Sequence, residues 1–396
     1  MEDNLHTKII RSLEEVRSVR PIWEKVQARE AHPRVNTDID RYLSLIQANT
    51  QQTQPYIILV KRNNITISLL IGYINISPIQ CNLGRKTLFK PSLKKLNIVY
   101  SGLLGNADRD VCCLLIENLI QILSSREADV VFFNHLDINS ELYKMLRKKP
   151  RIFCRDFFPK VESHWYMLIP QDFVQFLRTC SHNRRRNYKR WTKRFEKQFQ
   201  NQVKIETYSQ KNEVDLALEK ITYISSHTYQ RAFGGGVVNN FKTKALYNNA
   251  AEKGWLQTYV LSLNDEPCAF WTGLKYAGTF FAEHTGFLPK FREFHVGTVL
   301  FFKVVEDMCK DPEVDSFDFS FGDGQHKQWG ESKSRSEASV CIFAPRLYPI
   351  LVNMIFSLTT ATSRSIEYAV KKMNLIFHIQ KYRRYLAMRK AGQSMH

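Results

Sequence analysis

The stretch HTGFLPKFREFHVGTVLFFKVVEDMC at residues 284–309, followed by VDSFDFSF at 314–321, has the pattern of a strand end, a loop, a helix and a second strand. The same order occurs earlier in the chain, in YSGLL at 100–104, DVCCLLIENLIQIL at 110–123 and ADVVFF at 128–133. The two stretches share few identical residues, but their order and spacing agree. They predict an internal duplication of one β-rich α/β unit.

Further strand patterns precede the helix in each copy. In the first copy, two apolar runs flank Arg62-Asn63-Asn64 and predict a hairpin, with strands at 56–60 and 65–74. In the second copy, three predicted strands follow one another, at 254–263, 267–276 and 278–287. Strands that alternate with helices predict an α/β or α+β fold, with a mixed sheet in each of two tandem units.

We expect three parts: a first unit at 1–167, a second unit at 168–345 and a C-terminal helical extension at 346–396. The extension holds two amphipathic segments, YPILVNMIFSL and SIEYAVKKMNLIFHIQKYRRYL, and no strand pattern. We expect these helices to pack back on the domain. A position at a membrane interface, as a peripheral membrane contact, is an open alternative.

Charge, apolar runs and cysteine spacing indicate what the protein binds and in which compartment it works. A formal charge of +19 over 396 residues would attract polyanions, among them nucleotides, nucleic acid and anionic lipid. The N-terminus MEDNLHTKII lacks the apolar core of a signal peptide, and no apolar run approaches the roughly 20 residues of a spanning helix. The cysteines form no C-x-x-C pair. We therefore expect a cytoplasmic protein with reduced core cysteines and no metal.

A strongly basic helix is predicted between the two copies, in SHNRRRNYKRWTKRFEKQF at 181–199. Aromatic residues at helical spacing form one apolar stripe, and eight Arg and Lys residues between Arg184 and Lys197 cover the rest. A solvated surface face is the simplest interpretation. Binding of nucleic acid or a membrane surface is the alternative.

Several of these segments carry a resemblance to a known family. The basic helix, the run SSHTYQRAFGG at 225–235 and the stretch 284–300 followed by FDFSFGDGQHKQWG at 317–330 make the second half resemble the CelD-type acetyltransferase domain of the GNAT superfamily. That domain is similar to the Fem-type ligases, which carry two GNAT units in tandem. The first half resembles the N-terminal unit of those proteins more faintly. The resemblance implies two tandem GNAT-like units, the first of them degenerate.

The motif matches lie at Gly297 to Leu300, Asp318-Phe319, Gly322-Asp323 and Lys327, while His326 stands where the family usually has tyrosine. The family implies acetyl-CoA or acyl-CoA as co-substrate, with its pyrophosphate at the start of a helix, where unpaired N–H groups and the helix dipole favour anions. In this chain the expected donor-binding residues are Val296, Gly297, Thr298 and Val299. Of the superfamily's phosphate signature, only Gly297 remains in KFREFHVGT.

The implied reaction is attack of an amine on an acyl thioester, which needs a base for the ammonium proton. The candidate catalytic residues are His284, Asp323, His326 and Lys327. His284 is the preferred base, because the ordinary histidine pKa of about 6.5 suits proton acceptance near neutrality; a purely structural histidine is the alternative. Asp323 and Lys327 are expected to bind the acceptor, and His326 is the second candidate for proton transfer.

The predicted function is N-acyl transfer to a small amine, plausibly an amino sugar or a cell-surface polysaccharide precursor. The alternative is an aminoacyl-tRNA-dependent ligase or RNA-binding protein, in which the basic helix holds tRNA. Fem-type ligases usually insert a coiled-coil arm in the second unit, and this sequence has no such heptad insertion, which favours a small thioester donor. A catalytically silent scaffold is the third interpretation. The acceptor, the acyl chain and the oligomeric state stay open.

Overall fold

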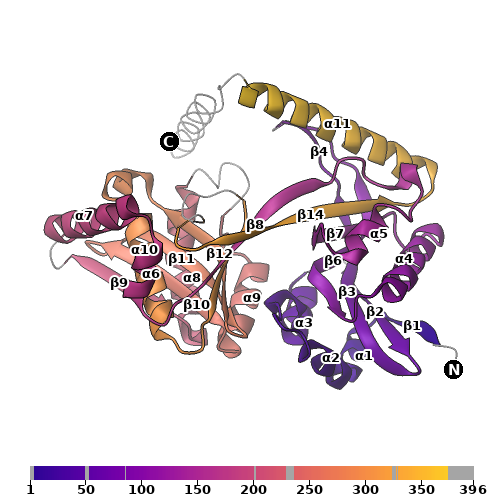
Figure 1. The fold of residues 1–396 in the computed structure, drawn as a ribbon, viewed down its shortest axis with the longest axis horizontal. Coiled ribbons are helices and arrows are strands. Elements are labelled where there is room, and N and C mark those ends of the chain that lie inside the picture. Colours follow the sequence, from indigo (N-terminus) through magenta and orange to yellow (C-terminus); the bar gives the residue numbers. More distant parts are fainter. Residues whose placement is uncertain are drawn as a thin grey trace. The chain divides into compact units, whose positions relative to one another are not determined.

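The computed structural model describes residues 4–49, 53–84, 86–199, 202–228, 236–322, 327 and 329–372. Two compact units divide the chain. The first contains the described residues of 1–162 and 336–376, and the second contains those of 163–335. Both units are built on a mixed sheet with helices, so the predicted α/β fold class is confirmed (Figure 1).

The sheet of the first unit is mostly antiparallel. Its strands, in sheet order, are β1 (Leu5–Ile10), β2 (Gln54–Arg62), β3 (Ile65–Pro78), β6 (Ser92–Gly105), β7 (Val130–Asp137) and β14 (Lys333–Phe343), the last belonging to this unit from Ser336 on. Only β6 and β7 pair in parallel. A separate hairpin is formed by β4 (Cys81–Leu83) and β5 (Lys86–Phe89).

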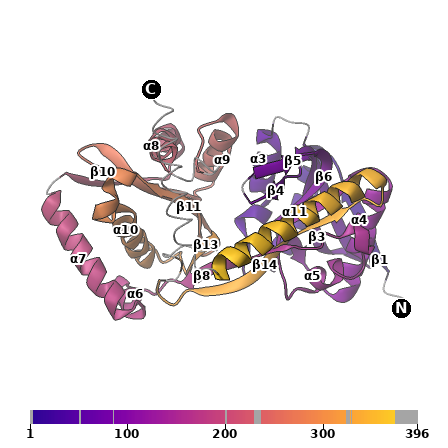
Figure 2. The same ribbon diagram turned by 90° about the horizontal axis from the view of Figure 1, so that it is seen from above.

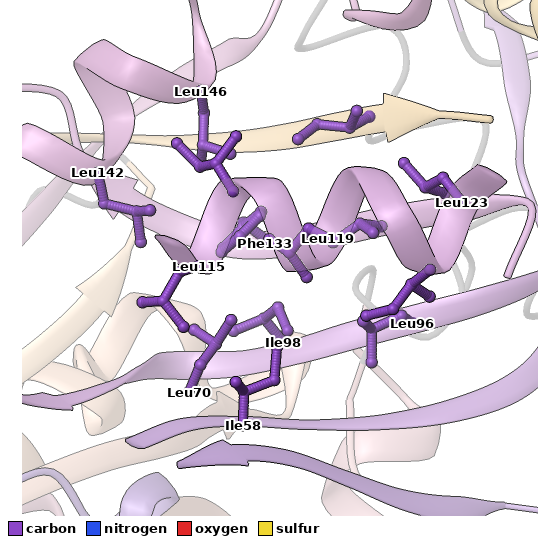
Figure 3. Packing of buried hydrophobic residues seen from close by; sticks show 14 of the residues in the cluster. Ile58, Leu70, Leu96, Ile98, Leu115, Leu119, Leu123, Phe133, Leu142 and Leu146 are labelled. Atoms are coloured by element: carbon purple, nitrogen blue, oxygen red, sulfur yellow. The ribbon is translucent and has the colours of Figure 1, made fainter. Parts of the chain in front are cut away.

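Helices cover both faces of this sheet because its strands are apolar on both faces. Ile58 and Leu70 pack with α4 (Arg109–Ser124) and α5 (Glu141–Leu146), as Figure 3 shows. Ile57 and Leu69, one position away on the same strands, pack on the opposite side. That side is covered by α1 (Leu13–Ser18), α2 (Arg20–Gln27) and α3 (Ile39–Ala48).

The sheet of the second unit has the same character. Its strands, in sheet order, are β8 (Lys160–Leu168, in this unit from Ser163), β13 (Ser316–Phe321), β12 (Thr279–Phe287), β11 (Glu266–Tyr276), β10 (Leu256–Leu263) and β9 (Val203–Tyr208). Only β12 and β13 pair in parallel. On one face lies α10 (Val296–Lys310), and on the other lie α8 (Val214–Ser226) and α9 (Phe241–Glu252), as Figure 2 shows. The remaining helices are α6 (Phe173–Thr179) and α7 (His182–Gln198).

Local backbone details support the predicted duplication. Each unit contains a hairpin, β2–β3 or β10–β11, whose two turn residues both have positive φ, Asn63-Asn64 in the first and Asn264-Asp265 in the second. The next strand that pairs with each hairpin, β6 or β12, has a bulge. The bulge lies opposite Gly72 in the first unit and opposite Gly273 in the second. A Cβ added at either glycine would lie within 2.8 Å of a carbonyl oxygen of the bulged strand. A bulge packed closely against a glycine therefore occurs at the same place in both units.

Alanine at these glycines should destabilise the fold. At Gly273 the new Cβ would lie 2.3 Å from the Phe281 carbonyl oxygen, and at Gly72 it would lie 2.8 Å from that of Asn97. Backbone atoms in a sheet cannot move aside cheaply, so we expect each substitution to cost about 2 kcal/mol, more at Gly273. Urea unfolding measures the loss. Wild-type stability for Gly273→Ala would contradict this close approach.

The C-terminal region differs from the expectation of two separate helices. α11 (Leu347–Lys372) is one continuous helix that includes the junction LTTATSR at 358–364. The junction contains no glycine or proline that would end a helix, and threonine hydroxyls there donate to carbonyl groups one turn back. The prediction of two separate helices was therefore wrong at the boundary between them, where the chain stays helical. The rest of the second segment, from residue 373, lies outside the described residues.

Candidate functional site

The parallel strands of the second unit separate before they end. β12 and β13 pair only over Thr279–Phe281 and Ser316–Asp318. Beyond these residues β12 continues to Phe287 against β11 alone, and β13 continues to Phe321 against β8 alone. The two strands therefore form no ladder with one another beyond these residues.

The predicted base lies on the separated part of β12. A bulge interrupts the pairing with β11, since Thr272 faces His284 and Gly273 faces Ala282, which leaves Glu283 as the extra residue. The side chain of His284 is exposed, and that of Glu283 is half-buried. The structure thus places His284 next to the separated strands, with its ring accessible to a substrate.

The separated end of β13 is held in an unusual conformation. Ser320 has a φ of +60°, and its backbone N–H donates to Oδ1 of Asp318 at 2.8 Å. Lys327 is buried, and its Nζ donates to the carbonyl oxygens of Ser320, at 3.2 Å, and of Phe321. Two charged side chains therefore fix the backbone of β13 where it leaves β12. Lys327 was predicted to bind the acceptor; in the structure its ammonium group contacts this backbone.

A buried histidine and aspartate pair supports the same segment. Nε2 of His164, on β8, lies 2.8 Å from both carboxylate oxygens of Asp318. Both side chains are almost fully buried, and the edge of the Phe321 ring faces the imidazole at 4.7 Å between centroids. Asp318 points away from α10, because its neighbours Phe317 and Phe319 pack on Phe301 of that helix. Sequence reasoning did not select His164 or this role of Asp318.

The predicted donor-binding residues form the first turn of α10. The helix starts after His295, which has the left-handed backbone conformation, and the N–H groups of Thr298 and Val299 donate to the His295 carbonyl oxygen. Val296 and Val299 are buried core residues, while Gly297 and Thr298 are partly exposed. A Cβ at Gly297 would lie 3.1 Å from Cδ1 of Phe287, so this glycine also allows close packing on the end of β12.

The basic helix α7 lies beside this turn. The indole of Trp191 stacks on the His295 ring with centroids 4.1 Å apart, and the guanidinium of Arg194 lies over the Phe294 ring. Burial, together with the positive charges of Arg190 and Arg194, lowers the pKa of His295. Positive charge is thus added to the N-terminal end of α10, which the helix dipole already makes favourable for anions.

Neutralising these arginines should raise the pKa of His295. In the Arg190→Gln, Arg194→Gln variant the repulsion between the guanidinium groups and the imidazolium is lost, while burial of the ring remains. The pKa should therefore move up toward 6.5 without reaching it. An NMR titration of the His295 ring measures the shift. An unchanged pKa would show that the two charges lie too far from the start of α10 to assist a bound anion.

Two predicted site residues, Asp323 and His326, lie outside the described residues. Their flanks are described: Gly322 follows β13 with a φ of +92°, and Gly330 has a φ of +67° and packs near Phe176 of α6. These glycines permit the sharp turns that the sequence suggested for residues 322–330. The roles proposed for Asp323 and His326 stay predictions.

The corresponding place in the first unit is occupied by paired side chains. Beyond the parallel pairing of β6 and β7, the hydroxyl of Tyr100 donates to Oε1 of Glu337 at 3.1 Å. Nε2 of His135 lies 3.2 Å from Oε2 of Glu162, and this contact, with help from Lys160, lowers the pKa of Glu162 to about 2. The acidic and basic groups here contact one another.

The described residues also bear on other classes of site. Among them, no cluster of three or more His, Cys, Asp or Glu side chains is arranged to hold a metal ion. Within the same residues, no helix is both long and apolar enough to cross a membrane. All eight cysteines are free thiols, and all except Cys113 are buried.

Comparison with known proteins agrees with this geometry. Residues 182–328 match the family model described as acetyltransferase (GNAT) domain, a range that runs from the start of α7 through β13 to Lys327. The second unit therefore carries a GNAT acetyltransferase domain, and the predicted enzyme class, a GNAT-like acyltransferase, is confirmed. No curated protein matches the chain in sequence.

Solved structures share the fold of most of the chain. FemX superposes with a TM-score of 0.55 at 9% sequence identity, over 84% of this chain and 98% of FemX. A tandem GNAT protein from the clavulanic acid biosynthesis pathway gives 0.52 at 10% identity, over 86% and 100%. A conserved protein of unknown function from Bacteroides thetaiotaomicron gives 0.50 at 10% identity, over 85% and 100%. These similarities show the tandem fold, since the identities are too low to carry an activity.

Proposed function

We propose that this chain, which carries a GNAT acetyltransferase domain in its second unit, transfers an acetyl or acyl group from a CoA-type thioester to an amine. One observation carries the proposal. The separated ends of β12 and β13, the first turn of α10 and the charges of Arg190 and Arg194 belong to one unit, and Phe287 at the end of β12 packs against Gly297 in the first turn of α10.

The diphosphate and the extended arm of the donor would bind at different places in this arrangement. Its diphosphate would accept hydrogen bonds from the first N–H groups of α10 near Gly297, assisted by the charges of Arg190 and Arg194. Its extended arm would then lie along the separated part of β12, because the Ser320 N–H and the Ser320 and Phe321 carbonyl groups of β13 already bond to Asp318 and Lys327. In this position the thioester carbonyl would lie beside the bulge at Glu283 and His284.

The chemistry is a simple acyl transfer. The amine nitrogen attacks the thioester carbonyl carbon, the C–S bond breaks, and the thiolate leaves and takes up a proton. His284 is our first candidate for the base that removes the ammonium proton, because its ring is exposed on the separated part of β12. His326 is the second candidate. For Lys327 we now favour a positioning role, since it holds the Ser320–Phe321 backbone.

The acceptor class rests on resemblance alone. A CelD-type domain implies an amino sugar or a similar amine, in the synthesis of cell-surface polysaccharide, and a cytoplasmic setting. The accessibility of His284 is compatible with a bulky acceptor. The paired side chains in the first unit, Tyr100 with Glu337 and His135 with Glu162, support the proposal that this unit does not carry the reaction.

A second candidate function is aminoacyl-tRNA-dependent ligation. The observation that favours it is the outer face of α7, where Arg186, Lys189, Arg190, Lys193 and Lys197 are exposed and lie within an arc of about 100°. Like charges at this spacing repel one another, and a bound polyanion would relieve that repulsion. CoA remains our first choice of donor, because the charges of Arg190 and Arg194 reach the start of α10.

The base can be tested with His284→Gln and His326→Phe. Loss of the base should lower kcat/KM by about 10²- to 10⁴-fold and remove the rise of kcat/KM with pH below neutrality. Affinity for the donor should stay unchanged in both variants, which is the control for folding. If both variants keep the wild-type pH profile, the base is neither histidine.

A further inference from the structure

The helix α11 buries several polar side chains and exposes large apolar ones. Its face toward the first unit holds the buried polar residues Asn353, Ser357 and Thr359. Nδ2 of Asn353 donates to the carbonyl oxygens of Phe153 and Arg155, at 2.9 and 2.7 Å. The hydroxyl of Ser357 accepts from the N–H of Phe157 at 3.3 Å. The helix is thus attached to the unit through these hydrogen bonds as well as through the buried Val352 and the partly buried Phe356.

The opposite face of α11 is apolar and exposed. Its exposed large apolar residues are Leu347, Tyr348, Leu351, Met354, Ile355, Leu358 and Ile366. At 100° per residue the six from Leu347 to Leu358 fall within an arc of about 120° and form one continuous stripe, which we call the α11 stripe; the exposed, polar Thr362 and Ser365 separate it from Ile366 on the same face. A stripe of this width on a soluble protein indicates that something covers it, because contiguous exposed apolar surface is unfavourable in water.

Segments that contact α11 also expose apolar side chains. η2 (Ile152–Cys154) and the residues after it contact the face of α11 toward the first unit through the hydrogen bonds of Asn353 and Ser357, and Ile152, Phe153, Phe157 and Phe158 are exposed on this segment. Near the other end of the helix, the hydroxyl of Ser363 accepts from the Gly84 N–H and donates to the Asn82 carbonyl oxygen, next to the exposed Leu88 and Phe89 of β5. Figure 1 shows α11 beside β4.

The charge around this surface is positive. Lys372, exposed in the last turn of α11, has the same helical direction as Met354 and so lies at the edge of the α11 stripe. Arg364 lies on the face toward the first unit and donates to the carbonyl oxygens of Phe158 and Pro159. Exposed Lys86, Lys90, Arg151 and Lys160 belong to the same segments. The only acidic residue of α11 is Glu367, and Asp156 in the adjoining segment is buried. The sequence after α11, residues 373–396, adds five Lys and Arg residues and no acid.

We infer that the α11 stripe docks on the surface of an anionic lipid bilayer. Leu, Met and aromatic side chains with Lys and Arg at the edge are the combination that partitions into the headgroup region. Because a second copy would bring the same positive edge against this face, self-association is the less favourable way to cover it. The inference concerns where the protein acts and stands independently of the donor proposed above.

The test is cosedimentation of the full chain with vesicles. One set contains phosphatidylcholine alone, and the other contains phosphatidylcholine with phosphatidylglycerol. Wild-type protein should bind the anionic vesicles at least about tenfold more tightly than the neutral ones, because several basic side chains approach the lipid phosphates. Added salt should weaken this binding.

A pair of matched variants locates the binding surface. Leu351 and Leu358 are 46% and 68% exposed, while Leu216 and Phe241 on the second unit are 47% and 68% exposed. Leu351→Asp with Leu358→Asp should weaken vesicle binding at least about tenfold, since two apolar side chains no longer enter the lipid. Leu216→Asp with Phe241→Asp should bind as wild type. All four sites are exposed, so circular dichroism should show both variants folded.

Three results would overturn the inference. One is wild-type protein that stays in solution with anionic vesicles, as expected if residues 373–396 cover the stripe. Another is equal binding by the two double variants. The third is a wild-type dimer in light scattering that only the Leu351 and Leu358 variant dissociates, which would assign the stripe to contact between copies. None of these results depends on acyl transfer, so the proposed function is judged separately.

Discussion

Gly297→Asp should weaken binding of a CoA thioester by about a hundredfold while leaving the protein folded. A carboxylate at the second residue of α10 would lie beside the proposed diphosphate, and two unit charges about 5 Å apart at an effective dielectric constant of 20 repel by about 3 kcal/mol. The same carboxylate interacts favourably with the N-terminal end of the helix dipole, so α10 itself should not be destabilised. Isothermal titration calorimetry measures the affinity.

Gly297→Ala is the matched control for this variant. Its Cβ meets the same atom, Cδ1 of Phe287 at 3.1 Å, and Phe287 is an exposed side chain that can shift slightly. Alanine should therefore bind the donor within a few-fold of wild type. Equal losses in the alanine and aspartate variants would show that Gly297 matters for packing on Phe287, and the diphosphate would then have to bind elsewhere.

Asp318→Ala should lower the free energy of unfolding of the second unit by about 3 to 5 kcal/mol, because it leaves His164 buried without the carboxylate that accepts from Nε2. It also removes the acceptor for the Ser320 N–H and so releases the end of β13 beside the proposed donor arm. Urea unfolding measures the stability, and kcat at saturating donor measures the effect on the site.

A double-mutant cycle measures how much of the stability loss comes from the interaction between His164 and Asp318. If His164 and Asp318 act together, the variant that lacks both side chains should lose clearly less stability than the sum of the two single variants. Asp307→Ala offers a comparison, because Asp307 on α10 accepts its hydrogen bond from the Tyr259 hydroxyl on β10 and not from His164 or Ser320. Strict additivity of the His164 and Asp318 losses would contradict the coupling.

The sequence predicts those parts of the fold that depend on local patterns. The turns Asn63-Asn64 and Asn264-Asp265 lie where the sequence places them, because Asn and Asp tolerate the positive φ of a tight hairpin turn. α4 covers the helical pattern at 110–123 and begins after Asp108, whose side chain caps it by accepting from the Val111 N–H. The apolar stripe of α7 does pack inward, with Trp191 on His295.

The parts that sequence reasoning missed depend on contacts between distant residues. His164 and Asp318 are 154 positions apart and meet because β8 pairs with β13, which no spacing in the chain reveals. The stack of Trp191 on His295 likewise joins two helices that are separate in sequence. The contacts of Lys327 were missed for the same reason: a lysine in a polar loop suggests a ligand contact, and no spacing reveals that its buried Nζ donates to backbone carbonyl groups.

The most direct test of the central claim is the affinity of the purified chain for a CoA thioester, compared with its affinity for aminoacylated tRNA, at low and moderate salt. We predict saturable binding of the CoA thioester, displaced by free CoA and weakened only modestly by salt, because a single diphosphate involves few charges. RNA held by the outer face of α7 would instead lose affinity steeply as salt rises. Tight, steeply salt-dependent tRNA binding with no detectable CoA binding would contradict the account.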